Sequence, residues 1–366
     1  MKIIHCADLH LDSKMSAHLN SDQEKEKRQN LLNSFSEMIQ YAKRNEINSV
    51  IIAGDLYDKK KISFEAKTKV LDTITLNTDI NFYYLKGNHD SESLFSDIEV
   101  FPTNLKLFDE KWIYYDAGEN VVICGIEVNK SNISDCYDKL NLDPRKINIV
   151  VMHGQENEYR NGDDTVVISI RELRNQNIDY LALGHIHSYK YKELDSRGHY
   201  CYSGCLEARG FDEIGEHGFV VLDIDEVNRT IKHEFIKIYP KHDVKQINID
   251  ITDINTAKGV IDKIDESFKK GRINDADIVK AVLLGEVNYD CNLNIDVIEK
   301  KLEDYCYAVK VEDKTSFKID YEQFKKNKSL KGEFVRLVEM QKDLSEEDKI
   351  KIIRYGINAL KGEEIG

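Results

Sequence analysis

The stretch YYLKGNHD, residues 83–90, places a hydrophobic strand directly before a Gly-Asn-His-Asp cluster. Gly, Asn and Asp tolerate tight or left-handed backbone geometry, so a strand-ending turn from Gly87 to Asp90 explains the cluster without any chemistry. Taken alone, the stretch leaves a plain turn and a functional loop equally open. The rest of the chain has to decide between them.

Composition is typical of a folded protein with one large domain and one or two smaller pieces. The chain has 366 residues, of which 41% are hydrophobic and 32% charged. No apolar run reaches the length of a membrane span and no signal peptide opens the chain, so we expect a cytoplasmic protein without a membrane partner. Seven cysteines without a CxxC pair predict reduced structural thiols. The net charge of −14 argues against a protein coated by nucleic acid, but leaves a local basic groove open.

The first half of the chain alternates strand-like and helix-like segments, which is the pattern of a layered α/β fold. One helix is expected to begin at a capping box formed by Ser21 and Glu24, and a second to cover about residues 63–76. Strands are expected at residues 2–7, 48–54, 80–86, 120–125, 147–152 and 179–183, with shorter hairpin-like strands at 189–202, 218–224 and 230–238.

The pattern resets near Pro240, which predicts a main domain over residues 1–240 and a small α/β domain over 241–315. Residues 316–366 are expected to form a charged helical segment. Its second helix is opened by a capping box at Ser345. Two short amphipathic helices cannot form a core alone, so we expect them to pack on something.

Five polar clusters each follow a hydrophobic strand, where an α/β sheet places its ligand-binding loops. They are Asp8-Leu9-His10, Gly54-Asp55-Leu56-Tyr57-Asp58, Gly87-Asn88-His89-Asp90, His153-Gly154 and Gly184-His185-Ile186-His187. Residues at i and i+2 of an extended segment point to the same side, so the DxH and HxH pairs can each aim two ligands into one pocket. Each cluster alone is explained by a turn, a surface loop or a structural histidine. Their joint occurrence favours one shared metal site.

The residue types in these clusters indicate the chemistry. Asp, Asn and His together suit two borderline divalent metals such as manganese, iron or zinc, whereas calcium prefers ligands that are all oxygen. Two such ions can activate a water, neutralise phosphate oxygens and steady a leaving group. A nearby histidine can supply the last proton. The clusters therefore favour a phosphoester hydrolase.

The motifs DxH, GDxxD, GNHD, a histidine after a strand, and GHxH, in this order, resemble the signature of the calcineurin-like metallophosphoesterases over residues 1–240. The resemblance implies a four-layer sandwich of two β-sheets flanked by helices, with a small α/β capping domain and C-terminal helices. It implies two divalent ions, foremost Mn²⁺, with Fe²⁺ and Mg²⁺ as alternatives. The implied ligands are Asp8, His10, Asp55 and His187 for one ion, and Asp55, Asn88, His153 and His185 for the other. His89 matches the catalytic histidine that protonates the leaving oxygen or stabilises the transition state.

A narrower resemblance is to the bacterial SbcD-type DNA repair nucleases. The opening IIHCADLHLDS, the loop AGDLYDKK and the segment YSGCLEARGFDEIGEHGF look like theirs. This implies a manganese-dependent exonuclease and single-strand endonuclease. The implied partners are DNA, an SMC-like coiled-coil ATPase gripped by the C-terminal helices, and a second copy of the chain. Two positions depart from the pattern, since Asp58 replaces the His of archaeal and eukaryotic relatives and Cys205 replaces the usual Ser.

Candidate substrate-binding residues are Asp58, Lys59, Lys60 and Arg209. A lysine run after a turn is equally well explained as a solvated helix entry. An enzyme alternative is a phosphatase or cyclic-nucleotide phosphodiesterase acting on small substrates. The non-enzyme alternative, a scaffold that has lost its metals, is disfavoured because every ligand type and His89 are present. The loop at 155–166 has no assigned role.

Overall fold

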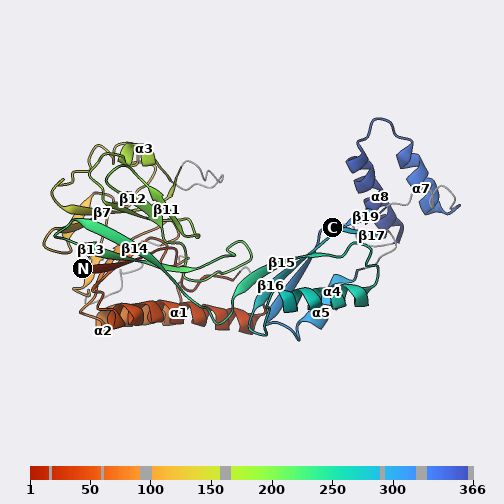
Figure 1. Ribbon diagram of the computed structural model, residues 1–366, viewed down its shortest axis with the longest axis horizontal. Helices are drawn as coiled ribbons and strands as arrows, with labels where there is room; N and C mark the ends of the chain where they lie inside the picture. The colour runs from red at the N-terminus through yellow and green to blue at the C-terminus, as the bar shows by residue number, and fades with distance from the viewer. Residues whose placement is uncertain are drawn as a thin grey trace. The chain divides into compact units, whose positions relative to one another are not determined.

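The computed structural model describes residues 1–15, 19–58, 62–90, 101–156, 166–288, 293–318 and 328–361. The chain divides into two compact units, Met1–Val244 and Lys245–Gly366. Each unit has its own β-sheets and its own hydrophobic core (Figure 1).

The first unit contains two six-stranded sheets. In order across the first sheet, the strands are β14 (Thr230–Lys237), β13 (Gly218–Asp225), β1 (Lys2–Cys6), β2 (Ser49–Ala53), β3 (Asn81–Leu85) and β4 (Leu105–Leu107). Across the second sheet they are β11 (Lys190–Glu193), β12 (His199–Tyr202), β10 (Tyr180–Gly184), β7 (Ile147–His153), β6 (Val121–Gly125) and β5 (Ile113–Asp116). β1 to β4 are parallel, as are β6, β7, β10 and β12, so their carboxyl ends gather at one edge of each sheet.

Helices and loops cover the outer faces of both sheets. Helices α1 (Ser21–Arg44) and α2 (Phe64–Leu76) pack on the first sheet, and the short helix α3 (Ile170–Leu173) belongs to the core outside the second (Figure 1). Residues of β1 alternate accordingly, since Ile4 joins the core beneath α1 whereas Ile3 joins the core between the sheets. The predicted α/β sandwich of two sheets flanked by helices is confirmed.

Several local predictions need correction. The predicted capping box at Ser21 and Glu24 was wrong, because Asn20 caps α1 and the Gln23 side chain accepts a hydrogen bond from the Asn20 backbone N–H. Asn is as favourable an N-cap as Ser, and Gln reciprocates as well as Glu. Strands β4 and β5, helix α3 and the short pair β8 (Gln155–Glu156) and β9 (Val167–Ile168) were not predicted. Each spans only two to four residues, too few for a hydrophobic period to appear.

A buried ion pair ties α1 to the segment that follows β12. Lys27 Nζ donates to Glu207 Oε2 at 2.7 Å and to the His242 carbonyl oxygen at 3.0 Å. The other oxygen of Glu207 accepts a hydrogen bond from Ser34. Only 2% of Lys27 and 1% of Glu207 remain exposed. The pair therefore anchors the segment that continues to Arg209 and Glu213.

Replacement of Lys27 by Met is expected to lower the free energy of unfolding by about 3–5 kcal/mol, because it leaves the Glu207 carboxylate buried without a counter-charge. Urea denaturation of the first unit measures the change. The double variant Lys27→Met/Glu207→Gln serves as the control and should recover most of the loss. A single variant as stable as the parent chain would contradict this account of the pair.

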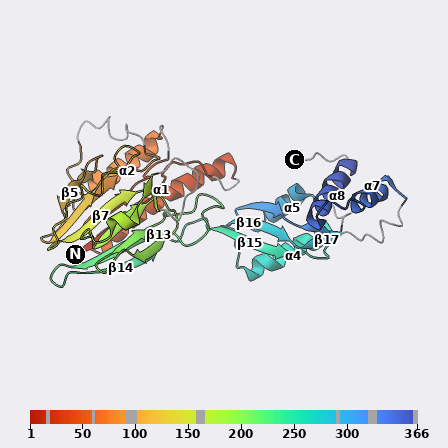
Figure 2. The ribbon, with the colours of Figure 1, turned by 90° about the horizontal axis from the view of Figure 1, so that it is seen from above.

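The second unit contains a three-stranded sheet in the order β15 (Val244–Asp250), β16 (Ile278–Leu284) and β18 (Ala308–Asp313). Helices α4 (Ala257–Lys270) and α5 (Ile295–Leu302) share one core with this sheet (Figures 1 and 2). A short parallel pair joins β17 (Glu286–Asn288) to β19 (Ser316–Lys318).

Two further helices, α7 (Leu330–Glu339) and α8 (Glu346–Lys361), pack against each other. Their shared core consists of Val335, Val338, Ile353 and Ile357. Ser345 Oγ accepts the backbone N–H of Asp348, which is one half of the predicted capping box, while the Asp348 carboxylate accepts a hydrogen bond from the Ser345 hydroxyl. Among the described residues, no helix has both the length and the apolar character needed to cross a membrane.

Candidate metal centre

The five polar clusters predicted from the sequence meet at the carboxyl ends of five strands, three from the first sheet and two from the second. Backbone hydrogen bonds continue the sheet pairing into the loops after β1 and β2. The Asp8 N–H donates to the Gly54 carbonyl oxygen at 3.0 Å, and the His10 N–H donates to that of Asp55 at 2.9 Å. The loops after β1 and β2 therefore run side by side.

Two glycines permit this close approach. A Cβ atom at Gly87 would lie 2.1 Å from Asp55 Oδ1, and one at Gly184 would lie 2.0 Å from the Ala53 carbonyl oxygen. Only glycine fits at either position without displacing the backbone or a carboxylate. The turn after β3 is thus part of the site, which favours the functional interpretation of GNHD over that of a plain turn.

The loop backbone differs from the extended geometry assumed for the DxH and HxH pairs. Asp8, His10, Asp55 and His185 have φ values of 53°, 42°, 51° and 101°, which lie in the left-handed region. The side chains do converge, but a strained backbone brings them together instead of the two-residue repeat of a strand. Such strain costs about 1–3 kcal/mol per residue and is concentrated at functional sites.

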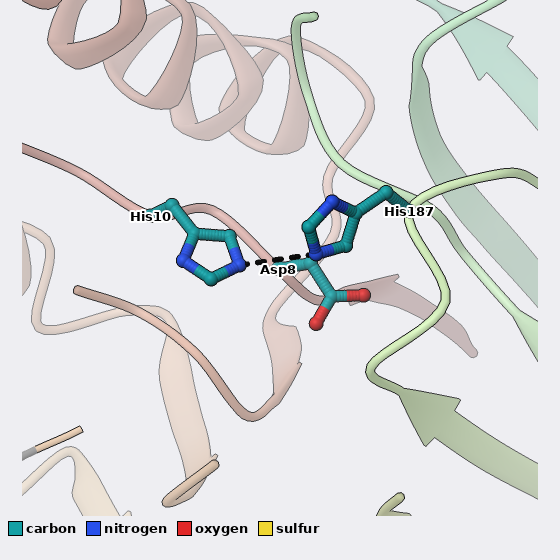
Figure 3. Close-up of side chains that lie close together, drawn as sticks. All are labelled: Asp8, His10 and His187. Atoms are coloured by element: carbon teal, nitrogen blue, oxygen red, sulfur yellow. Dashed lines mark hydrogen bonds between the residues drawn. The ribbon is translucent and has the colours of Figure 1, made fainter. Parts of the chain in front are cut away.

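The first group of candidate ligands consists of Asp8, His10 and His187, whose ligand atoms lie within 4.8 Å of one another. Figure 3 shows the two imidazoles facing each other beside the carboxylate, with 3.2 Å between their Nε2 atoms. His187 Nδ1 donates to Glu213 Oε1 at 2.6 Å, so its Nε2 carries no hydrogen in the neutral ring. His10 Nδ1 is buried 3.2 Å from Asp58 Oδ1, within ion-pair distance but without the geometry of a hydrogen bond. Two imidazole nitrogens that face each other beside a carboxylate suit a cation.

The second group consists of Asp55, His153 and His185. His153 Nδ1 donates to the Ala53 carbonyl oxygen at 2.9 Å, so in the neutral ring the lone pair is on Nε2. That nitrogen lies 3.0 Å from Asn88 Oδ1 and 3.3 Å from Asp55 Oδ2. His185 Nδ1 lies 3.3 Å from the same Asn88 oxygen. These acceptor atoms converge on one point, as ligands of a second cation would.

The Asp55 carboxylate stands between the two groups. Its Oδ2 lies 3.3 Å from His153 Nε2 in one group and 3.7 Å from His10 Nε2 in the other. Its Oδ1 accepts the His89 backbone N–H at 2.8 Å. This position fits a carboxylate that bridges two ions.

The electrostatic field at the site favours positive charge. Burial lowers the pKa of His153, but the carboxylates of Asp55 and Asp8 outweigh burial and raise that pKa to about 9. Burial raises the pKa of Asp55, but His153 and His10 outweigh it and hold the pKa below its ordinary value. The carboxylates that raise the pKa of His153 also attract cations, and together with the converging ligand atoms they make the residues present fit divalent metals.

The affinity of the metal-free protein for Mn²⁺ is expected to rise with pH up to about 9. His153 must lose its proton before Nε2 can bind an ion, and its pKa is raised to about 9. Release of this one proton makes the apparent affinity rise by up to about tenfold per pH unit below that value. Calorimetric titrations at pH values between about 6.5 and 8.5 measure the slope. An affinity independent of pH across this range would contradict the assignment of His153.

A third group, His10, Asp58 and His89, borders the first. Asp58 Oδ1 lies 2.8 Å from His89 Nδ1 and 3.2 Å from His10 Nδ1, while Asp58 Oδ2 lies 3.9 Å from Arg209 Nη1. The hydrogen bond to Asp58 raises the pKa of His89. His89 is 45% exposed, so its ring is accessible to a substrate.

Two of the predicted substrate-binding residues thus contact other side chains of the site. Asp58 faces two histidines, and Arg209 binds Glu213. Lys59 and Lys60 lie outside the described residues, as does most of the loop at 155–166. The substrate-binding role of all four residues stays a prediction.

Two acidic residues of the site, Glu213 and Asp90, were not predicted from the sequence as functional residues. Glu213 partners His187, and Asp90 accepts the backbone N–H groups of Leu56, Tyr57 and Gly87, which joins the loops after β2 and β3. Burial, and then the charge of Asp55, raise the pKa of Asp90 to about 6. Glu213 lies 26 residues after His187, a separation that no local pattern reveals. Asp90 was visible within GNHD, but only as a turn residue.

Comparison with known proteins agrees with this geometry. Residues 1–189 match the family model of calcineurin-like phosphoesterases. An uncharacterized metallophosphoesterase, YhaO, of Bacillus subtilis is 26% identical, over 78% of this chain and 72% of its own length. The SbcD component of the nuclease SbcCD of Staphylococcus epidermidis is 24% identical, over 69% of this chain and 74% of its own. The DNA double-strand break repair protein Mre11 of Aeropyrum pernix is 23% identical, over 69% and 64%. The family match covers more than half of the chain, which therefore belongs to the calcineurin-like phosphoesterases, hydrolytic enzymes that bind divalent metals.

Proposed function

We propose that this chain is a two-metal phosphodiesterase that cleaves DNA. The observation that carries the chemistry is the Asp55 carboxylate, which stands between two groups of converging lone pairs with His89 beside them. Two ions about 3.5–4 Å apart are the arrangement that clamps a phosphoryl group during in-line displacement. The similarity to two proteins named as a nuclease and a DNA repair protein supports DNA as the substrate.

One ion would be held by Asp8, His10, Asp55 and His187, and the other by Asp55, Asn88, His153 and His185. When bound, the ions would supply a nucleophilic water and neutralise the charge of the phosphate oxygens. Carboxylate, amide and imidazole ligands together suit Mn²⁺, with Fe²⁺ and Mg²⁺ as alternatives.

His89 would donate a proton to the leaving oxygen. Asp58 Oδ1 lies 2.8 Å from Nδ1 of this ring, which leaves the other nitrogen, Nε2, as the proton donor. The hydrogen bond to Asp58 also raises the pKa of His89, so the His89 ring is protonated in a larger fraction of the molecules near neutral pH. Asp58 therefore acts on the substrate through His89 in this proposal.

The first test is cleavage of a labelled DNA duplex and a labelled single strand in the presence of Mn²⁺, Mg²⁺ or EDTA, with a His89→Gln variant as the matched control. Cleavage that requires Mn²⁺ and is lost in the variant would support the proposal. If DNA stays intact while a p-nitrophenyl phosphodiester is hydrolysed, the substrate is a small phosphodiester and the DNA role is wrong.

The C-terminal helix pair is proposed to bind an SMC-like coiled-coil ATPase. While its inner face is buried, the pair exposes 54% of Leu337 on α7, 73% of Met340, the residue that caps the carboxyl end of α7, and 54% of Tyr355 on α8. Exposed apolar side chains at helical spacing suit the side of a partner helix.

A chain that ends at residue 320 is expected to keep its hydrolytic activity, because the groups of candidate metal ligands lie within residues 8–187. It is expected to lose the partner, because α7 and α8 are removed. Co-purification with an SMC-like ATPase from the same genome measures binding. The full chain carrying Leu337→Glu and Met340→Glu is the matched variant and should lose binding as well. If the truncated chain and the doubly substituted chain both bind the ATPase as the parent chain does, the helices do not bind the partner.

A further inference from the structure

We propose that Arg209 is a positioning residue that holds two carboxylates, Glu213 and Asp58, and through them orients the histidines of the metal centre. The inference deepens the proposed function and rests on it, since the oriented rings are taken to bind metal. It gives Arg209 a role inside the protein in place of the DNA contact suggested by the sequence.

The first carboxylate, Glu213, is held by Arg209 on one side and by His187 on the other. The guanidinium places Nη2 2.5 Å and Nε 3.1 Å from Glu213 Oε1, and the Arg209 backbone N–H donates to Oε2 at 2.7 Å. His217 Nε2 lies 2.6 Å from the Glu213 carbonyl oxygen and fixes the main chain. Only 5% of the Glu213 side chain is exposed, so its charge depends on these partners.

Glu213 in turn fixes His187. His187 Nδ1 lies 2.6 Å from a Glu213 carboxylate oxygen and 3.3 Å from Arg209 Nη2. The shorter contact, to a carboxylate, makes Nδ1 the donor, which turns the Nε2 lone pair toward His10 and Asp8. Carboxylates that accept from a ligand imidazole set its tautomer and raise its basicity. Without the Arg209 side chain, Glu213 would lose the guanidinium contacts that fix its position, and His187 would lose a firmly placed partner for Nδ1.

The second carboxylate, Asp58, lies on the other side of the guanidinium. Arg209 Nη1 is 3.9 Å from Asp58 Oδ2, while Asp58 Oδ1 faces His89 at 2.8 Å and His10 at 3.2 Å. One cation thus separates two carboxylates that would otherwise repel each other. Removing it would loosen His10 and His89 together with His187.

The same contacts argue against a direct phosphate contact. The Nε and Nη2 groups of Arg209 contact Glu213, Nη2 also lies 3.3 Å from His187 Nδ1, and only 15% of the side chain is exposed. An arginine that binds the DNA backbone presents its planar fork of donors to solvent before the substrate arrives. Arg209 presents that fork to Glu213 instead.

Arg209→Gln and Arg209→Lys test the inference, since lysine keeps the charge but cannot bridge two carboxylates with a planar fork. Both variants are expected to bind Mn²⁺ about 10–100-fold more weakly in calorimetric titrations and to lower kcat, with KM for DNA unchanged. Glu213→Gln should reproduce the loss, and combining it with Arg209→Gln should add little.

A readout on the metal-free protein separates positioning from catalysis. In ¹⁵N-histidine NMR spectra, His187 of the parent chain should show a protonated Nδ1 and an unprotonated Nε2, and Arg209→Gln should produce a mixture of tautomers. Arg197→Gln is the matched control. Arg197 forms a comparable ion pair with Asp179, at 2.8 Å, which precedes the amino end of β10, whereas the metal centre follows its carboxyl end. Circular dichroism verifies that each variant is folded.

Three results would decide the matter. Weaker Mn²⁺ binding and altered tautomers in folded Arg209 variants would support the inference. Normal Mn²⁺ binding with a raised KM for DNA, and a shallower salt dependence of binding, would overturn it in favour of a phosphate contact. Failure of the proposed function looks different, because the parent chain itself would then fail to bind Mn²⁺ or to cleave DNA.

Discussion

A His89→Gln chain is expected to cleave DNA about 10²–10⁴-fold more slowly than the parent chain while binding the same number of Mn²⁺ ions. His89 contributes its backbone N–H to Asp55, which glutamine retains. Its ring contacts Asp58 and packs edge-on against His10, with 5.0 Å between the ring centroids, but it belongs to neither of the two groups assigned to the ions. Glutamine is similar in size and polarity but cannot supply a proton at neutral pH. Steady-state cleavage assays at saturating Mn²⁺, together with calorimetric metal titration, measure the two quantities separately.

Asp58→Asn is the informative companion to that variant. The amide keeps an oxygen facing the two imidazoles but loses the charge, so we expect a smaller loss of activity, about 10–100-fold. If His89→Gln instead abolishes Mn²⁺ binding, His89 is a ligand and the role assigned to it is wrong. If both variants cleave DNA at the parent rate, neither side chain takes part in the chemistry.

Asp55→Asn is expected to abolish binding of both ions and with it all hydrolysis. The carboxylate lies between the two groups, and an amide offers one neutral oxygen where two ions require shared negative charge. Thermal unfolding with and without Mn²⁺ gives a test independent of activity. The parent chain should gain about 2.7 kcal/mol of stability for each ion that it binds when free Mn²⁺ is about a hundred times Kd, whereas Asp55→Asn should gain nothing.

Asp8→Asn provides the contrast for that experiment. Asp8 belongs to the first group only, and it also accepts the His185 backbone N–H at 2.8 Å, a contact that the amide oxygen preserves. This variant is expected to keep one Mn²⁺ ion per chain. An Asp55→Asn chain that also keeps one ion would show that Asp55 serves a single metal and does not bridge.

The sequence allowed the strands and the loops after them to be predicted because parallel strands buried on both faces are read as continuous apolar runs. The runs before Asp8, Asp55, Asn88, His153 and His185 are of this kind, and the topology then collects their ends at one edge. The reason given for the DxH pair was nevertheless wrong, since Asp8 and His10 have left-handed backbone geometry instead of an extended one. The correct residues were found by a pattern whose physical basis differs from the one supposed.

The supporting residues were beyond the reach of sequence reasoning for a different reason. Glu213 reaches His187 across 26 residues, and Lys27 reaches Glu207 across 180, through packing that no local period encodes. A carboxylate in a polar stretch gives no sign of whether it faces solvent or a buried ring. Arg209 shows the same limit, because its charge suggested a DNA contact while its partners lie within the protein.

The left-handed backbone at Asp8, His10, Asp55 and His185 has a consequence for laboratory evolution of this enzyme. Glycine or asparagine adopts that geometry more easily than these residues do, so part of the conformational cost can be relieved by mutation. A screen for heat resistance carried out with a chelator present would therefore enrich substitutions at these positions and select thermostable but inactive variants. Supplying Mn²⁺ during the screen would reverse that tendency, because bound ions would then stabilise the chains that keep the original residues.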